Sequence, residues 1–112
     1  MADEPVFQVE DYQGHRITLT RRTFENHLRY RPEIAEYVEE AKQTLQDPDV
    51  TVTIESGGKW YYKAGLGRGR FRQTYLGVLV YDRGQNEGVV ATIMLSRRLS
   101  EGIIEVRRWP VF

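Results

Sequence analysis

The spacing of apolar side chains changes once along the chain, near Pro48, and this change limits the folds that the sequence can form. Before Pro48 the apolar residues recur at helical spacing, and after it they alternate with polar residues as in a β-strand. Gln46-Asp47-Pro48 marks the boundary because proline cannot continue a helix. We therefore expect helices followed by strands, which is the order of an α+β domain.

The part before Pro48 predicts two helices. Thr18 or Thr20 can cap a helix over about Arg21–Tyr30. A second helix starts at Pro32, where a proline in the first position costs no hydrogen bond, and ends at Gln46-Asp47-Pro48. Its apolar stripe consists of Ile34, Tyr37, Val38, Ala41 and Leu45. Four glutamates, Glu33, Glu36, Glu39 and Glu40, lie off this stripe and indicate a solvated face rather than a metal site.

The part after Pro48 predicts an antiparallel meander of four or five strands. A hairpin turn at Gly57-Gly58 separates the first two strands, and the continuous apolar run Leu76–Tyr81 indicates a central strand. The two N-terminal helices pack on this sheet in a single domain, residues 1–112, with residues 1–16 as an N-terminal arm or hairpin. The expected strands begin at Val50, Lys59, Arg70, Val89 and, for the fifth, Ile103.

Composition excludes several classes of protein. The 112 residues contain no cysteine and only two histidines, so we expect no disulfide scaffold, no metal site and no cofactor. The formal net charge is zero, so generic attraction to polyanions is not expected. No apolar run approaches membrane-spanning length and Met-Ala-Asp-Glu-Pro is unlike a signal peptide, so we expect a cytoplasmic protein without a membrane partner.

The charges are divided unevenly between the two halves. Residues 1–56 hold 12 acids and 6 bases, whereas residues 57–112 hold 4 acids and 10 bases. The second half can therefore present a basic face for nucleic acid, although the same arginines could simply be solvated charges on edge strands. The candidate nucleic-acid-binding residues are Lys59, Lys63, Arg68, Arg72, Arg97 and Arg98.

One stretch of the sheet combines basic and aromatic residues. Strand alternation places Tyr61 on the same face as Lys59 and Lys63, a pairing that suits single-stranded nucleic acid, and sends Trp60 and Tyr62 into the core. The glycine-rich loop that follows, Gly65 to Arg70, lies between strands. We therefore expect either a flexible hairpin loop or a mobile basic loop that binds phosphate through Arg68 and Arg70.

His27 is the histidine with the more suggestive neighbours. It shares a helix face with Phe24 and Leu28, and Arg31 follows one turn later. Imidazole suits proton transfer near neutral pH and arginine suits a phosphate oxyanion. The alternative is a histidine satisfied by a neighbour at the helix–sheet boundary. His15, in the expected arm, lacks such company.

Read in order, these motifs resemble a known family, the phage-associated nuclease-like domains of the barnase, EndoU, colicin and RelE fold group. The similarity spans Ile17 to Ser96. The segments that carry it are Ile17-Thr18-Leu19-Thr20, His27-Leu28, Arg31-Pro32-Glu33-Ile34, Thr44-Leu45-Gln46-Asp47-Pro48-Asp49-Val50, Tyr61-Tyr62, Leu79-Val80 and Thr92-Ile93-Met94-Leu95-Ser96.

The resemblance implies an RNase-like domain that cleaves RNA by metal-independent transesterification, with toxin-like members restrained by an antitoxin or immunity-type protein. His27 would be base or acid, Arg31 and Arg70 would hold phosphate with Arg72, and Asn26 could instead occupy the position of the family histidine. Tyr61, Thr92 and Ser96 would position the phosphate. The alternatives are a non-catalytic nucleic-acid- or protein-binding module of the same fold, or a phage or mobile-element accessory protein.

Overall fold

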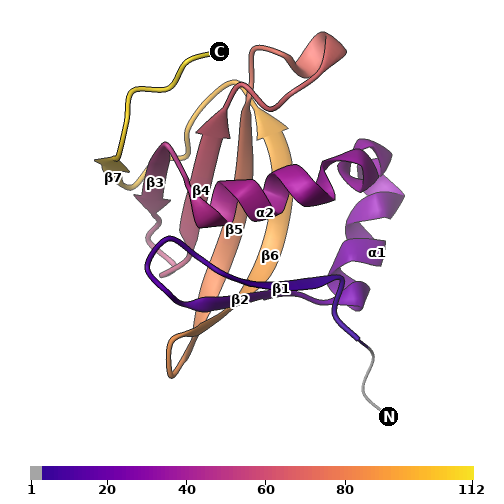
Figure 1. Ribbon diagram of the computed structural model, residues 1–112, viewed down its shortest axis with the longest axis vertical. Helices are drawn as coiled ribbons and strands as arrows, with labels where there is room; N and C mark the ends of the chain where they lie inside the picture. Colours follow the sequence, from indigo (N-terminus) through magenta and orange to yellow (C-terminus); the bar gives the residue numbers. More distant parts are fainter. Residues whose placement is uncertain (1–3) are drawn as a thin grey trace.

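The computed structural model describes residues 4–112, which form one seven-stranded sheet with two α-helices against one face (Figure 1). The strands are β1 (Phe7–Glu10), β2 (Arg16–Leu19), β3 (Val50–Thr53), β4 (Lys59–Ala64), β5 (Tyr75–Gly84), β6 (Glu87–Ser96) and β7 (Ile103–Val106). The helices are α1 (Arg21–Tyr30) and α2 (Val38–Gln46), with 3-10 turns η1 (Pro32–Tyr37) and η2 (Gly69–Phe71). The α+β architecture is therefore as expected.

The sheet is wider than predicted and is mixed rather than wholly antiparallel. Its strand order is β1-β2-β6-β5-β4-β3-β7, and β2 runs parallel to β6. The expected four or five strands did not count the N-terminal segment, predicted as an arm or hairpin. It forms the β1–β2 hairpin, which extends the sheet at β6 and places two strands before the helices. β5 lies at the centre of the order, as the apolar run predicted.

The helical segment agrees with its local signals. The Thr20 hydroxyl accepts the backbone N–H of Thr23 at 3.2 Å and so caps α1. The segment that starts at Pro32 first forms the 3-10 turn η1 and only then the α-helix α2. Four residues of the predicted stripe, at positions 34, 37, 41 and 45, are buried. This stripe packs α2 onto the sheet. No helix within residues 4–112 is long and apolar enough to cross a membrane.

Both faces of the sheet carry a hydrophobic cluster. The helix-side cluster joins Ile34 and Leu45 to Tyr61, Val78 and Ile93. The far-side cluster contains Val50, Val52, Trp60 and Tyr62, with Tyr75, Leu79 and Met94 packed against it. Because alternate residues of β4 enter different clusters, this strand is buried on both faces.

The double burial of β4 overturns the expected basic and aromatic face. Tyr61 is only 2% exposed and lies under the helices, so Lys59, Tyr61 and Lys63 do not form an exposed basic and aromatic face. Trp60 and Tyr62 are buried as expected, but in the far-side cluster rather than under the helices. The alternation of residues 59–63 between the two faces of β4 was predicted correctly, but the exposure of the face with Lys59, Tyr61 and Lys63 was not.

Candidate functional site

The structure gathers three of the predicted RNA-binding arginines around one shallow pocket. Arg70 and Arg72 come from η2 and the turn after it, and Arg97 comes from the residue after β6. Gly69 and Gln73 complete the lining of this cavity, whose volume is about 340 Å³. We call this site the arginine pocket. It contains no acidic residue, and no ion pair within residues 4–112 involves its three arginines.

The loop that carries Arg70 and Arg72 is built around a close backbone approach. A Cβ on Gly67 would lie 1.9 Å from the Phe71 carbonyl oxygen, so only glycine fits there. The same carbonyl accepts the Thr74 hydroxyl at 2.6 Å, and Thr74 is buried. The loop predicted to be flexible thus contains a short 3-10 turn that fixes the backbone of the two arginines beside Arg97.

Two of the other predicted cations, Arg68 and Lys59, are already engaged by the protein. Arg68 donates to the Glu40 carboxylate at 2.6 Å and to the Glu36 carbonyl at 2.7 Å, so it is tied to the helical segment and does not grip an external phosphate. The ammonium group of Lys59 donates to the Tyr12 hydroxyl at 2.7 Å. Arg98 is exposed but is not part of the arginine pocket lining.

Lys63 belongs to a second cationic cluster, which we call the Asp47 clasp and which comprises Asp47, Asp49, Lys63, Arg107 and Arg108. Asp47 accepts from Arg107 at 3.0 Å and lies 3.3 Å from the Lys63 ammonium, and Asp49 pairs with Arg108 at 3.2 Å. The Arg108 and Arg107 hydrogen bonds hold the pKa of Asp47 far below its ordinary value of 3.8. The clasp therefore pairs each of its three cations with at least one of its two carboxylates.

The imidazole of His27 is hydrogen-bonded to the sheet. The pairing of β5 with β6 shifts between Leu79 and Val80, which leaves Ala91 as an extra residue in β6. The His27 Nε2–H donates to the Ala91 carbonyl at 2.8 Å, so the imidazole satisfies a backbone group at this bulge. This arrangement agrees with the interpretation of His27 as a histidine satisfied at the helix–sheet boundary. Its Nδ1 remains as the nitrogen that could accept a proton.

The residues expected to act with His27 are divided between the two faces of the sheet. Thr92 and Ser96 pair with Leu79 and Tyr75, which belong to the far side, whereas His27 approaches from the helix side. The Ser96 hydroxyl is also used locally, because it donates to the Arg98 carbonyl at 2.8 Å. Arg31 ends α1, and its backbone N–H donates to the His27 carbonyl. These residues therefore do not form one constellation.

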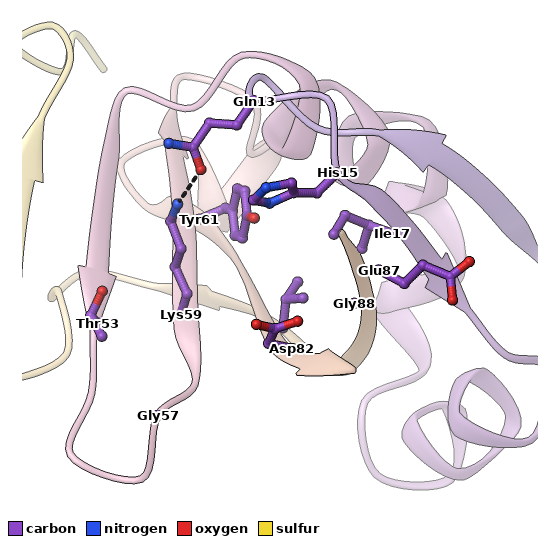
Figure 2. Close-up of a pocket in the computed structure, with 11 residues that line it drawn as sticks. Gln13, His15, Ile17, Thr53, Gly57, Lys59, Tyr61, Asp82, Glu87 and Gly88 are labelled. Carbon is purple, nitrogen blue, oxygen red and sulfur yellow. Dashed lines mark hydrogen bonds between the residues drawn. The ribbon is translucent and has the colours of Figure 1, made fainter. Parts of the chain in front are cut away.

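A second cavity, of about 200 Å³, lies between the β1–β2 turn, β4 and the β5–β6 hairpin (Figure 2). We call it the hairpin pocket. Figure 2 shows His15 and Gln13 reaching toward β4, with Asp82 across the opening. The side chains that give it its chemistry are His15, Lys59, Tyr61, Asp82 and Glu87.

A buried carboxylate organises the hairpin pocket. Asp11 accepts the Tyr61 hydroxyl at 2.6 Å and the backbone N–H groups of Gln13 and His15 at 2.9 Å each. Burial, and next the hydrogen bond to Asp11, raise the pKa of Tyr61 far above its ordinary value of 10.0, so Tyr61 is not a base. From the sequence we found no arginine or apolar helix face beside His15 and did not identify Asp11, which lies 3.7 Å from its Nδ1. The four-residue spacing of Asp11 and His15 around a turn was the sequence signal that could have predicted this contact.

The electrostatics of the two pockets differ. Lys59 is the one lysine or arginine lining the hairpin pocket, and Asp82 and Glu87 lie on its wall. A polyanion would meet these carboxylates there, whereas it would meet only cations in the arginine pocket. Within residues 4–112 no group of three or more histidine or carboxylate side chains is arranged to hold a metal ion. The arginine pocket is therefore the better candidate for an anionic ligand.

Comparison with known proteins adds no family or fold relative. A scan against protein-family models, a search of curated proteins and a search of solved structures each found no match to the chain. The candidate site therefore depends on the geometry alone.

Proposed function

We propose that this domain binds single-stranded RNA and that the arginine pocket holds the RNA phosphates. The observation that carries the proposal is the convergence of Arg70, Arg72 and Arg97 on a cavity without an acidic residue. Guanidinium groups match phosphate oxygens in geometry and in charge. Contacts of protein cations with the phosphates of a nucleic acid provide most of the affinity for it. The cavity volume of about 340 Å³ also suits a small polar group such as a nucleotide.

The test is a salt titration of RNA binding. Each phosphate contact on a single strand contributes about 0.7 to the slope of log affinity against log salt, so three arginines give a slope of about 2. Arg70→Ala combined with Arg72→Ala should lower this slope by about 1.4 and weaken binding roughly tenfold or more at low salt. Fluorescence anisotropy with a labelled oligonucleotide measures both quantities.

Arg83→Ala is the matched control. Arg83 is equally exposed but lies in the β5–β6 hairpin, at the end of the sheet opposite to η2 (Figure 1). Its replacement by alanine changes the net charge by one without touching the arginine pocket, so the slope should stay near the wild-type value. A slope that falls equally for all arginine replacements would mean diffuse attraction and no phosphate site. Absence of binding at low salt would contradict the proposal.

Metal-independent cleavage of the bound RNA is the second candidate function. The favouring observation is that the Ala91 carbonyl fixes Nε2 of His27 as a donor and leaves Nδ1 as a proton acceptor. A general base of this kind contributes about 10²- to 10⁴-fold, so His27→Ala should reduce cleavage by that factor while RNA affinity stays unchanged. The assay follows labelled RNA in EDTA and examines the products for 2′,3′-cyclic phosphate ends. Undiminished cleavage by the His27→Ala variant would exclude His27 as the base, and absence of cleavage by the wild-type protein would leave the binding function alone.

A further inference from the structure

A row of aromatic rings crosses the far side of the sheet. Trp60 stacks on Tyr62 with ring centroids 5.5 Å apart, Tyr62 meets Tyr75 edge-on at 5.7 Å, and Tyr75 meets Phe112 edge-on at 5.0 Å. The rings become more accessible along the row, from buried Trp60 and Tyr62 through partly buried Tyr75 to Phe112, which is 54% exposed. The row therefore ends in a ring at the surface.

The accessible end of this row lies at the same corner of the sheet as the arginine pocket. Tyr75 pairs across β5 and β6 with Ser96, the residue before Arg97, and Arg72 precedes Tyr75 by three positions. In Figure 1 η2 and the C-terminus lie at the same end of the sheet. A ring face beside cations is the arrangement that holds single strands, because the phosphates meet the cations while the bases stack.

Phe112 is held on Tyr75 by weak contacts. Residues 109–112 make no hydrogen bond or ion pair with any residue in the part of the chain that the structure describes. The segment is tethered by the Asp47 clasp through Arg107 and Arg108, and its backbone passes Gly65 closely enough that a Cβ there would lie 3.0 Å from the Val111 carbonyl oxygen. Phe112 can therefore leave Tyr75 without breaking the clasp.

We infer that Tyr75 is a base-stacking subsite for single-stranded RNA and that Phe112 occupies it in the free protein. The inference depends on the proposed function, because the arginine pocket supplies the phosphate contacts. A nucleobase that replaces Phe112 keeps an aromatic contact with Tyr75 and places its phosphate toward Arg72 or Arg97. Phe112 then competes with the RNA base and limits the affinity of the free protein.

The experiment compares two labelled oligonucleotides of about eight nucleotides, one of uridines and one with the same ribose-phosphate backbone but no bases. Phe112→Ala should tighten binding of the uridine strand roughly three- to tenfold and leave binding of the abasic strand unchanged, because only a base competes with the ring. Tyr75→Leu should weaken the uridine strand about tenfold and bring its affinity close to that of the abasic strand.

Matched variants separate stacking from loss of structure. Trp109→Ala removes another exposed ring of the same segment and should bind like the wild type. Tyr75→Phe keeps an aromatic ring and should restore the affinity for the uridine strand that Tyr75→Leu loses. Thermal melting checks that Tyr75→Leu is folded. If Tyr75→Leu does not fold, the stacking subsite is tested by Phe112→Ala alone, which removes a half-exposed ring.

The possible failures are distinguishable. If the abasic strand binds but neither Phe112→Ala nor Tyr75→Leu changes the ratio of the two affinities, the stacking subsite is wrong and the phosphate site stands. If neither strand binds to the wild-type protein at low salt, the proposed function fails, and the stacking subsite fails with it.

Discussion

The arginine pocket and the Asp47 clasp are both built from cations of the second half of the chain, yet their electrostatic states are opposite. In the clasp, Arg107 and Arg108 reach Asp47, and Lys63 reaches it from β4. In the pocket, Arg70, Arg72 and Arg97 line one cavity without a carboxylate. The clasp therefore holds the protein together, and the pocket concentrates positive potential at the surface.

The difference arises from what the fold places opposite each group. β7 pairs with β3, and this pairing brings Arg107 and Arg108 to the turn between α2 and β3, about 60 positions earlier in the chain. η2 lies beyond the end of the sheet instead, beside the cationic end of β6. The number of basic residues in the sequence cannot distinguish these two outcomes.

The largest effect that tests this comparison is loss of stability on breaking the clasp. Asp49 is buried, accepts the Ala64 N–H at 2.9 Å and pairs with Arg108. Asp49→Ala removes these acceptors and should lower the free energy of unfolding by about 2–3 kcal/mol, because a buried donor is left without a partner. Urea denaturation measures the change.

The arginine pocket should show the reverse behaviour. The Asp49→Ala protein should keep its RNA affinity within about twofold under conditions where it is folded, whereas Arg70→Ala with Arg72→Ala should lose affinity and change stability by less than about 0.5 kcal/mol. Asp82→Ala, which removes an exposed aspartate, is the control for loss of a carboxylate. If both the clasp and the pocket variants lose stability equally, the two regions do not differ as described.

Local signals in the sequence predicted the helices well. Thr20 caps α1 and Pro32 begins the next helical segment because both effects act within one turn of the backbone. The parallel pairing of β2 with β6 was not predictable in this way, since it joins residues about 70 positions apart. β7 begins at Ile103, where the possible fifth strand was expected, whereas β1 was predicted only as part of an N-terminal arm or hairpin.

The candidate site was predicted only in part for the same reason. Alternation correctly placed Lys59, Tyr61 and Lys63 on one face, but it carries no information on whether that face is covered. Arg70, Arg72 and Arg97 were identified as candidate cations, and their meeting at one cavity follows from the β5–β6 pairing. Asp11 lies only four residues before His15, so this contact had a local signal, whereas the hydrogen bond of Tyr61 to Asp11 joins positions 50 residues apart.

The smallest effect concerns the pH dependence of the clasp. Because the Arg108 and Arg107 hydrogen bonds lower the pKa of Asp47 in the folded protein below its ordinary 3.8, the unfolded chain binds a proton first as the pH falls. The contribution of Asp47 to stability is therefore complete above about pH 5 and is lost progressively as the pH falls through 4 toward the folded pKa. Since the Asp47 side chain is 49% exposed, solvent screening limits this contribution to about 1 kcal/mol. Urea denaturation of wild-type and Asp47→Asn proteins should show this difference at about pH 6 and a smaller one below about pH 3. Salt should reduce the difference at pH 6, and a difference that grows on acidification would refute the assignment of the lowered pKa to Asp47.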